Sequence, residues 1–324
     1  MDRAEFEAVV AQAMLAPSAH NTQPARWALR DGGIDILADL SRRLPVGDPT
    51  DRDLEVSCGA AVEGTVLALA ARGAGASVTL TEGTGGTRLR PIARVVPEGV
   101  AAPDDAALAA EMSGRLTHRA GFSPASKAAL DNWADAHMTL VTAAAQIDWL
   151  AKQIDIASAR IVRPKPFRAE LLQWMRLRKD DPKYDADGLN RDVLVMDAIT
   201  ARLVPVVLGG KVYDLLSALG LGPLLSGEAA RSSDASAIAL FHWPAEGAMV
   251  DAGRAFYRTW LQASARGLVG WPAAALADDP DTRAAVSDRF GVSGDRVLFN
   301  ALRLGVANKA TPSRARLSLR DVII

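Results

Sequence analysis

The sequence has a single cysteine, a near balance of charges and no long apolar run. Cys58 is the only cysteine among 324 residues, which excludes an internal disulfide and favours a reducing, cytoplasmic location. The first ten residues carry acids where a secretory signal would carry Lys or Arg, and no apolar run approaches the roughly 18 residues that cross a membrane. With 37 Lys and Arg against 38 Asp and Glu, the net charge is -1, so we expect neither nucleic acid nor a membrane as a partner.

The chain also lacks the motifs of several enzyme classes. Gly210-Lys211 is followed by Val212 and has no upstream glycine at the P-loop spacing, which excludes P-loop phosphoryl transfer. Neither the G-x-G-x-x-G of a dinucleotide-binding Rossmann domain nor the G-x-S-x-G of α/β-hydrolases is present. The histidines have no metal-binding spacing and no cysteine pair to join them, so no metal site is predicted: His20, His118, His137 and His242.

Three pairs of neighbouring acids are interpreted as helix caps rather than as catalytic carboxylates. Asp104-Asp105, Asp180-Asp181 and Asp278-Asp279 lie beside prolines or at expected helix starts. There a carboxylate accepts free backbone N–H groups and interacts favourably with the helix dipole.

The composition is that of a globular protein, with 49% hydrophobic and 23% charged residues, and the length suggests two lobes. Apolar spacing predicts helices at 5–15 and 54–72. Short segments rich in β-formers predict strands at 26–30, 34–40, 77–81 and 90–96. The Asp31-Gly32-Gly33 turn joins the first two strands into a hairpin. These elements make a first half over residues 1–98, and the stretch 96–105, with its two prolines and a glycine, is expected to be a linker.

A second half over residues 99–324 repeats the mixture of helices and strands. Helices are predicted at 124–136, 144–162 and 249–266. Strands are predicted at 138–142, 236–243 and 296–305. Residues 163–232 form a mostly helical insertion whose aromatic and Met residues suit either a lid or, more commonly, a packed core. The predicted class is α+β, and two similar halves in one chain would suit a fused pseudo-dimer.

Two polar tracts are candidates for ligand binding. Residues 17–24, Pro-Ser-Ala-His-Asn-Thr-Gln-Pro, concentrate hydroxyl, amide and imidazole groups between a helix and a strand, although the same residues are also ordinary turn formers. In an extended tract, Arg115, Thr117 and Arg119 would place two guanidinium groups and a hydroxyl on one side, where Arg forks suit phosphate oxygens. The alternative for this second tract is a solvated basic turn.

Both tracts resemble sequences of the FMN-dependent nitroreductase family. APSAHNTQP resembles the flavin-contacting loop of that family, and RLTHR resembles its R-x-S-x-[RK] phosphate motif with Thr117 in the Ser position. Further tracts resemble the single-chain tandem, Acg-like branch, in which two nitroreductase halves share one polypeptide: 41–45, 58–61, 174–176, 184–190, 253–257 and 271–272. The resemblance implies a three-layer α/β/α nitroreductase-like fold with an intramolecular pseudo-dimer.

The resemblance also implies a set of FMN contacts at the seam between the halves. The first half would contribute Pro17, Ser18, Ala19 and Asn21 to the flavin. The phosphate would be held by Arg115, Thr117, Arg119, Arg314 and Arg316. Asn190 would face the pyrimidine edge, and a backbone N–H of the Pro272, Ala274 and Ala275 loop would point at flavin N5. The lysine that the family usually carries three residues after the asparagine is Val193 here.

By this resemblance the protein is expected to be an oxidoreductase that takes hydride from NADH or NADPH and reduces a small acceptor, such as a nitroaromatic or a quinone, by ping-pong kinetics. No side chain is expected to be a nucleophile or base, because the flavin carries the chemistry. The alternative is a protein that stores or sequesters FMN without turnover. A monomeric pseudo-dimer or a weak homodimer is expected.

Overall fold

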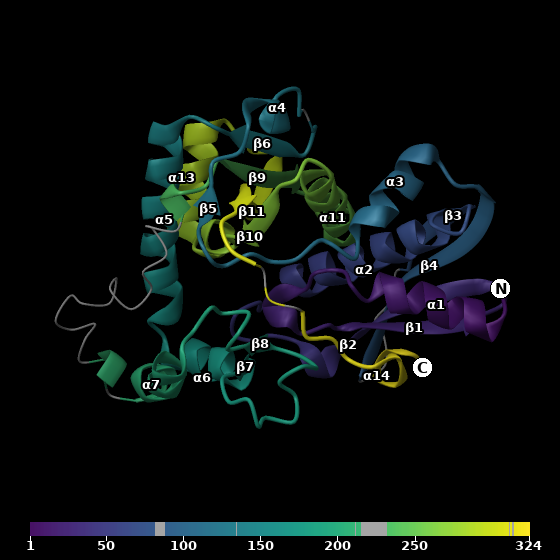
Figure 1. The fold of residues 1–324 in the computed structure, drawn as a ribbon, viewed down its shortest axis with the longest axis horizontal. Coiled ribbons are helices and arrows are strands. Elements are labelled where there is room, and N and C mark those ends of the chain that lie inside the picture. The colour runs from purple at the N-terminus through teal and green to yellow at the C-terminus, as the bar shows by residue number, and fades with distance from the viewer. Residues whose placement is uncertain (82–87, 134, 211, 215–231, 311, 313) are drawn as a thin grey trace.

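Two antiparallel sheets and a central pair of helices organise the protein (Figure 1). The computed structural model describes residues 1–81, 88–133, 135–210, 212–214, 232–310, 312 and 314–324. The longer helices are α1 (Arg3–Ala13), α2 (Arg52–Ala70), α3 (Pro103–Glu111), α5 (Ala144–Val162), α6 (Lys165–Gln173), α7 (Ala198–Gly209), α11 (Met249–Ala265) and α13 (Pro280–Phe290). Shorter helices are η1 (Ala19–Asn21), η2 (Leu40–Arg42), α4 (Lys127–Leu130), α12 (Ala275–Asp278) and α14 (Leu319–Val322).

The first sheet has the strand order β1-β2-β4-β3. Its strands are β1 (Ala25–Arg30), β2 (Gly33–Asp39), β3 (Ala74–Leu80) and β4 (Leu89–Val100). The hairpin predicted between 26–30 and 34–40 is confirmed, and its turn uses positive φ at Asp31 (46°) and Gly32 (74°). The predicted linker at 96–105 is wrong, because β4 runs through Val100 and α3 begins at Pro103.

The second sheet has the order β10-β11-β9-β6, with β5 paired to β11. Its strands are β5 (Phe122–Ser123), β6 (Met138–Val141), β9 (Ala237–Pro244), β10 (Val269–Pro272) and β11 (Arg296–Ala307). The predicted helix at 124–136 is wrong, since among its described residues only Lys127–Leu130 are helical. Asp131 is extended at the C-cap and Asn132 has a left-handed φ of 54°, which ends the helix early. The predicted α+β class is confirmed.

Helices α2 and α11 cross between the two sheets at very short range. A Cβ placed on Gly59 of α2 would lie 1.9 Å from the Val250 carbonyl oxygen of α11. Reciprocally, a Cβ on Gly253 of α11 would lie 2.1 Å from the Val56 carbonyl oxygen of α2. The absence of these two side chains lets the helix backbones touch, so the two sheet layers are held at a fixed seam.

The C-terminal segment crosses this seam. After β11 of the second sheet the chain runs to α14, which lies beside α1 and β1 of the first sheet (Figure 1). Ile323 forms a parallel bridge with Trp27, and the Ile324 N–H donates to the Trp27 carbonyl oxygen at 3.0 Å. Val322 is 1% exposed within the apolar core of the first sheet. The two sheets are thus tied by helix packing and by the tail.

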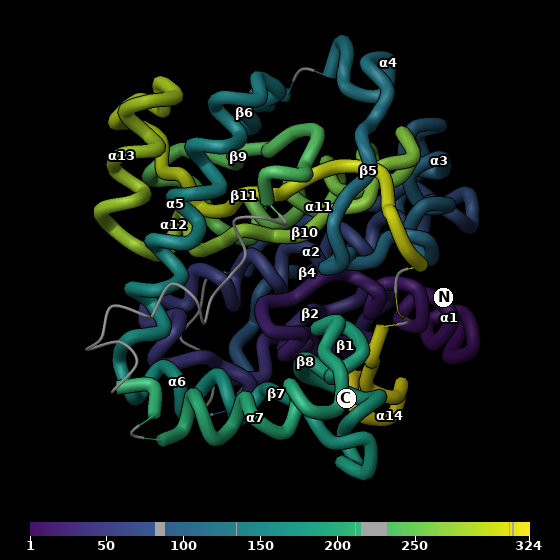
Figure 2. Tube along the Cα trace, turned by 60° about the vertical axis from the view of Figure 1, so that its left-hand side comes forward, coloured from purple at the N-terminus to yellow at the C-terminus, as the bar shows by residue number. Residues whose placement is uncertain are grey.

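The expected helical insertion at 163–232 is only partly described. Its described part contains α6, α7 and a small parallel pair, β7 (Met175–Arg176) with β8 (Leu189–Asn190). This part lies at the opposite end of the molecule from α4 and β6 in both views (Figure 2). Residues 211 and 215–231 lie outside the described residues. Within the described ranges, no helix combines the length and apolarity needed to span a membrane.

Candidate functional site

A cavity of about 390 Å³ lies where loop 17–24, α2, α11, β10 and the C-terminal segment meet. All the residues predicted to contact the flavin line it, except Asn190 and Ala275: Pro17, Ser18, Ala19, Asn21, Arg115, Thr117, Arg119, Pro272, Ala274, Arg314 and Arg316. These residues are far apart in sequence and come from both sides of the α2–α11 seam. The volume is in the range of small-molecule and cofactor sites.

Loop 17–24 is held in a strained backbone conformation. His20, Asn21 and Gln23 all have left-handed φ values, between 46° and 54°, which non-glycine residues rarely adopt. The Asn21 side chain donates to the Gly188 and Ala315 carbonyl oxygens at 3.1 and 3.2 Å. The Gln23 side chain donates to the Ala186 carbonyl oxygen at 2.9 Å. Polar contacts to distant segments therefore fix the loop that forms one wall of the cavity.

Three guanidinium groups meet at one backbone carbonyl. Arg115, Arg314 and Arg316 all donate to the Leu15 carbonyl oxygen, at 3.2, 3.3 and 3.0 Å. Arg316 also donates to Asn21 Oδ1 at 2.8 Å. Among the described residues, no carboxylate forms an ion pair with any of the three. The neutral carbonyl leaves three positive charges uncompensated, and an anion is the ligand that would balance them.

Arg115 is the most deeply buried member of this cluster. It is 3% exposed, and its Cζ lies 4.3 Å from the centroid of the Trp260 ring. Its Nε and Nη1 atoms have no hydrogen-bond partner among the described residues. Burial lowers the pKa of Arg115 to about 10 and that of Arg316 to about 9, with smaller effects from neighbouring guanidinium groups. Both values stay above neutrality, so buried donors with full charge face the cavity.

The tract from Arg115 to Arg119 lies against β10 in an extended conformation. Thr117 forms a parallel bridge with Gly270, and the His118 N–H donates to the Gly270 carbonyl oxygen at 2.9 Å. Arg115, Thr117 and Arg119 line the cavity and His118 does not, as the alternation of an extended chain predicts, although Leu116 also reaches the wall. A Cβ on Gly270 would lie 2.7 Å from Trp260 Nε1, so glycine permits this close packing.

A pair of carboxylates lines the same cavity. Asp53 lies in the first turn of α2, and Asp278 is the last residue of α12. Arg52 joins them: its Nη2 donates to Asp53 Oδ1 at 2.8 Å and also to Asp278 Oδ1. Burial raises the pKa of Asp278 to about 7, and the neighbouring Asp53 adds to the shift. The cavity thus has cationic and acidic groups in different parts of its wall.

Two predicted residues lie off the cavity wall. Asn190 is buried, donates to the Tyr184 carbonyl oxygen at 3.0 Å and accepts the Val193 N–H at 2.9 Å. It holds the loop that places Val193 on the wall. Ala275 begins α12, whereas Ala274 lines the cavity and its N–H donates to no described residue. The role of this loop as a main-chain donor to the flavin stays a prediction.

Several wall residues were missed by the sequence reasoning. Asp278 was assigned as a cap together with Asp279; that interpretation holds for Asp279, which accepts the Thr282 N–H at 3.0 Å, but is wrong for Asp278. Asp53, Phe256 and Trp260 also line the cavity, as does His20, which belongs to the predicted 17–24 tract. Asp53 and Ser57 stand one turn apart on α2, and Phe256 and Trp260 one turn apart on α11. This i, i+4 spacing was the available signal, but core helices share it.

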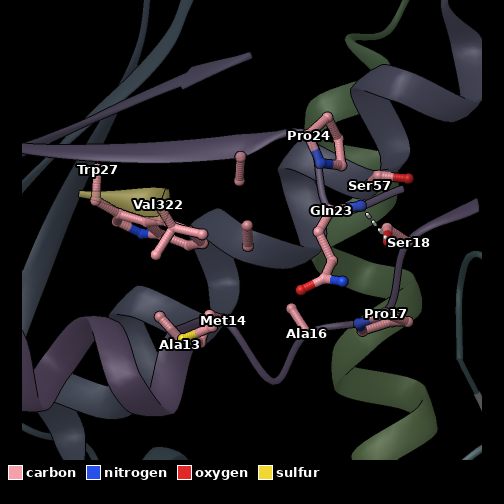
Figure 3. A pocket seen from close by; sticks show the side chains of 12 residues that line it. Ala13, Met14, Ala16, Pro17, Ser18, Gln23, Pro24, Trp27, Ser57 and Val322 are labelled. Carbon is pink, nitrogen blue, oxygen red and sulfur yellow. Dashed lines mark hydrogen bonds between the residues drawn. The ribbon is translucent and has the colours of Figure 1, made fainter. Parts of the chain in front are cut away.

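A second, much smaller cavity lies behind loop 17–24. Its volume is about 20 Å³, which is room for about one water molecule. Figure 3 shows Ser18 and Gln23 on one side of it, with the Gln23 N–H donating to Ser18 Oγ, and Trp27 and Val322 on the other. It is too small for an organic ligand, so the larger cavity is the candidate site.

The solved structure of a "putative nitroreductase" from Anabaena variabilis superimposes on this chain with a TM-score of 0.52. The match covers 94% of this chain and 88% of that one, at 10% sequence identity, which is a likeness of fold. The chain has the nitroreductase fold. The three-layer nitroreductase-like fold expected from the sequence is therefore confirmed.

Sequence comparison supports the same relationship over a shorter stretch. "Putative NAD(P)H nitroreductase Rv3131" of Mycobacterium tuberculosis is 38% identical over 72 residues, which are 22% of this chain and 21% of that protein. "Putative NAD(P)H nitroreductase acg" of the same organism is 36% identical over 73 residues, 22% of each chain. The matches span about a fifth of these relatives' length. The resemblance to the nitroreductases and to Acg is confirmed, while no family model matches the chain.

Proposed function

We propose that this chain binds FMN in the cavity at the seam and is an NAD(P)H-dependent oxidoreductase that reduces a small organic acceptor. The observation that carries the proposal is the cluster of Arg115, Arg314 and Arg316 on the Leu15 carbonyl oxygen. Three cations without a carboxylate fit a phosphate dianion, and Arg115 keeps two buried nitrogen atoms without a described partner for it. The donor set of this chain therefore fits the phosphate of FMN.

Other wall residues would hold the rest of the cofactor. Loop 17–24 is fixed by Asn21 and Gln23, so Pro17, Ser18 and Ala19 would form a rigid surface for the ring. The Ala274 N–H is an available donor for a ring nitrogen. Phe256 and Trp260 line the cavity from α11 and would limit access of water on that side. When bound, the flavin supplies reversible acceptance of a hydride, and the protein supplies position and electrostatics.

We also propose the class of the electron acceptor and the order in which the two substrates bind. A nitroaromatic or quinone-like compound would bind after the oxidised nicotinamide leaves, in the same cavity, which gives ping-pong kinetics. The names of the relatives include NAD(P)H, which supports a nicotinamide donor. A reducing cytoplasm, in line with the lone Cys58, would supply that donor. With the seam already formed inside one chain, a monomer or a weak homodimer is sufficient, and no nucleic acid is required.

The alternative function, FMN storage, has one observation in its favour. Val193 lines the cavity at the position where the resemblance leads one to expect a lysine. Without a cation at that position, the reduced flavin would lose one source of charge stabilisation. Storage predicts tight FMN binding with slow or absent reduction by NADH and NADPH.

The purified protein with FMN bound decides between these functions. We expect a yellow protein whose flavin absorbance bleaches anaerobically on addition of NADH or NADPH and returns when a quinone is added. Bleaching by dithionite alone would favour storage. A protein that retains no FMN even when the cofactor is supplied in excess would contradict both.

A further inference from the structure

We propose that Asp278 and Asp53 share one proton across Arg52 and that Asp278 delivers this proton to the acceptor when it is reduced. This proposal rests on the proposed function. It concerns a part of the cavity that the cofactor contacts described above do not use, and it assigns a proton donor to a site whose chemistry was expected to need none from the protein.

Each of the two carboxyl groups uses one oxygen atom, Oδ1, to accept hydrogen bonds from Arg52. Arg52 Nη2 donates to Oδ1 of Asp53 and to Oδ1 of Asp278, and Arg52 Nε also donates to Asp53 Oδ1 at 3.0 Å. Within the described ranges, neither Oδ2 atom has a hydrogen-bond partner. Two carboxylates on a single guanidinium carry an excess negative charge, which one bound proton removes.

The surroundings favour Asp278 as the protonated member. Asp53 keeps two donors from Arg52, whereas Asp278 has one. Asp48 adds negative charge from the α2 side. Arg283 of α13 donates to the Ala277 carbonyl oxygen, and Arg160 of α5 pairs with Asp279, so neither neutralises Asp278. The raised pKa of Asp278, about 7, follows from its burial and from Asp53.

Two buried side chains in the wall of the same cavity, apart from the carboxyl groups, also indicate a ligand site. Arg115 and Trp260 are 3% and 1% exposed, line this cavity and carry nitrogen atoms without a described partner. Asp278 ends α12, the short helix that follows β10, and lines the same cavity as Trp271 and Pro272 of β10. A carboxyl group in this position can reach a ligand that fills the cavity, which a surface carboxyl cannot.

The stoichiometry of the reaction leaves a role for this proton. Reduction of a quinone to a hydroquinone takes two electrons and two protons. The hydride that the nicotinamide donor gives up carries both electrons and one proton. The second proton must reach the other oxygen atom of the acceptor: the O–H bond of Asp278 breaks, an O–H bond forms on the acceptor, and the carboxylate regains a proton from water. Proton transfer from a positioned acid typically accelerates such a step by about 100-fold or more.

The first test titrates the apo protein, which needs neither FMN nor turnover. Infrared spectra of the wild type, labelled at aspartate with 13C, are compared with those of Asp278→Asn and Asp53→Asn. We expect one carboxyl band that disappears as pH rises through about 7, is absent in Asp278→Asn, and disappears at lower pH in Asp53→Asn because the like charge is gone. The exposed Asp180→Asn is the control and should leave the band unchanged. An identical band in Asp278→Asn would overturn the proposal.

The second test follows the acceptor half-reaction of the FMN-loaded, reduced protein with benzoquinone by stopped flow. We expect the wild-type rate to fall as pH rises above about 7, and Asp278→Asn to be about 100-fold slower at pH 6 with no such fall. An Asp278→Asn rate and pH profile equal to those of the wild type would contradict proton delivery. If NADH and NADPH fail to bleach the flavin, the proposed function is wrong, whereas the infrared titration still decides whether the proton is shared.

Discussion

Arg115 and Arg316 differ from most other arginines of this chain in the partners they have. Arg176, for example, pairs with Asp187 at 2.7 Å, and Arg94 pairs with Asp35 at 2.9 Å. Arg115 and Arg316 instead donate to backbone carbonyls in a buried environment. Burying a charge without a counter-ion lowers the stability of the apo protein. A bound anion would supply the counter-ion, so these residues favour binding of an anion.

Removal of either buried arginine should weaken FMN binding. Hydrogen bonds to charged groups contribute about 1.5–3 kcal/mol, so Arg115→Ala and Arg316→Ala should each raise the FMN Kd by roughly 10- to 100-fold. Quenching of FMN fluorescence measures the affinity. Arg30→Ala, at an exposed position near Asp35, is the matched control and should leave the Kd unchanged. An unchanged affinity in both buried variants would contradict the phosphate assignment.

A histidine away from the site should control acid stability. His242 Nδ1 accepts from Arg296 Nε at 2.8 Å, and burial, followed by the charge of Arg296, lowers the pKa of His242. The neutral form is therefore favoured in the folded state, and the unfolded state binds more protons once pH falls below about 6.5. The contribution of His242 to the free energy of unfolding should decrease as pH drops through this window, whereas Asp278, whose pKa is raised, contributes in the opposite direction.

Urea unfolding at pH 7.5 and pH 5 tests this expectation. His242→Gln keeps a polar group but cannot be protonated, so its loss of stability between the two pH values should be smaller than that of the wild type. Equal losses in the two proteins would show that His242 does not contribute.

At the residue scale, the sequence predicts which side chains of one extended tract point the same way, but it does not predict which residues of distant tracts meet. An extended backbone predicts that Arg115, Thr117 and Arg119 share one side, and all three line the cavity, but it does not predict that Leu116 lines it too. The pairing of Asp278 with Asp53 needs α12 and α2 to meet, which no local pattern encodes. Asn190 was expected at the flavin because of a motif, yet its side chain is occupied by its own loop.

At the scale of elements, the crossing of α2 and α11 depends on two glycines. Gly59→Ala and Gly253→Ala would each place a Cβ about 2 Å from a carbonyl oxygen of the other helix. The helices would have to separate, and overpacking of this kind typically costs about 1–3 kcal/mol or more. We expect both variants to unfold at lower urea concentration, and Gly59→Ala also to bind FMN more weakly because Ala60 and Val56 line the cavity.

Gly294→Ala is the matched control for these variants. No atom lies within 4 Å of a Cβ placed there, and its φ is not left-handed. Its urea midpoint should equal that of the wild type. A stability of Gly59→Ala and Gly253→Ala equal to that of Gly294→Ala would mean that the crossing distance can relax at no cost.

Elements with strong local signals were the predictable ones. The α5 prediction at 144–162 matches Ala144–Val162, because apolar residues recur at helical spacing over five turns. The prediction of a helix at 124–136 was wrong because helical propensity continues past Asp131 and Asn132, whereas the backbone turns at these two residues. The predicted linker was wrong because prolines and a glycine also occur at the ends of β4 and α3.

At the scale of the whole molecule, ligand binding should stabilise both layers together. An anion that contacts Arg115, Arg314 and Arg316 joins the tract that lies against β10 to the C-terminal segment while it compensates their charge. A ligand present at about 100 times its Kd adds about 2.7 kcal/mol to the free energy of unfolding. FMN should therefore raise the Tm in a single cooperative transition.

The same experiment with Arg115→Ala provides the comparison. Its Tm should respond to FMN only at much higher concentrations, because the shift depends on the ratio of ligand concentration to Kd. Riboflavin, which lacks the phosphate, should give little shift with either protein. An equal shift from riboflavin and FMN in the wild type would show that the phosphate is not bound by the arginines.

The division of the chain into two halves at residue 98 stays a prediction.

The path of the C-terminal segment has a consequence for biosynthesis. Translation proceeds from the N-terminus, so the strands of both sheets have left the peptidyl-transferase centre before Arg314 and Arg316 are added. Loop 17–24 is made well before its hydrogen-bond partners at 315–317, which follow it by 294 or 295 residues. A nascent chain consequently lacks the anion-binding cluster until Arg314 and Arg316 have emerged from the ribosome, so all three arginines can hold an anion only after that point.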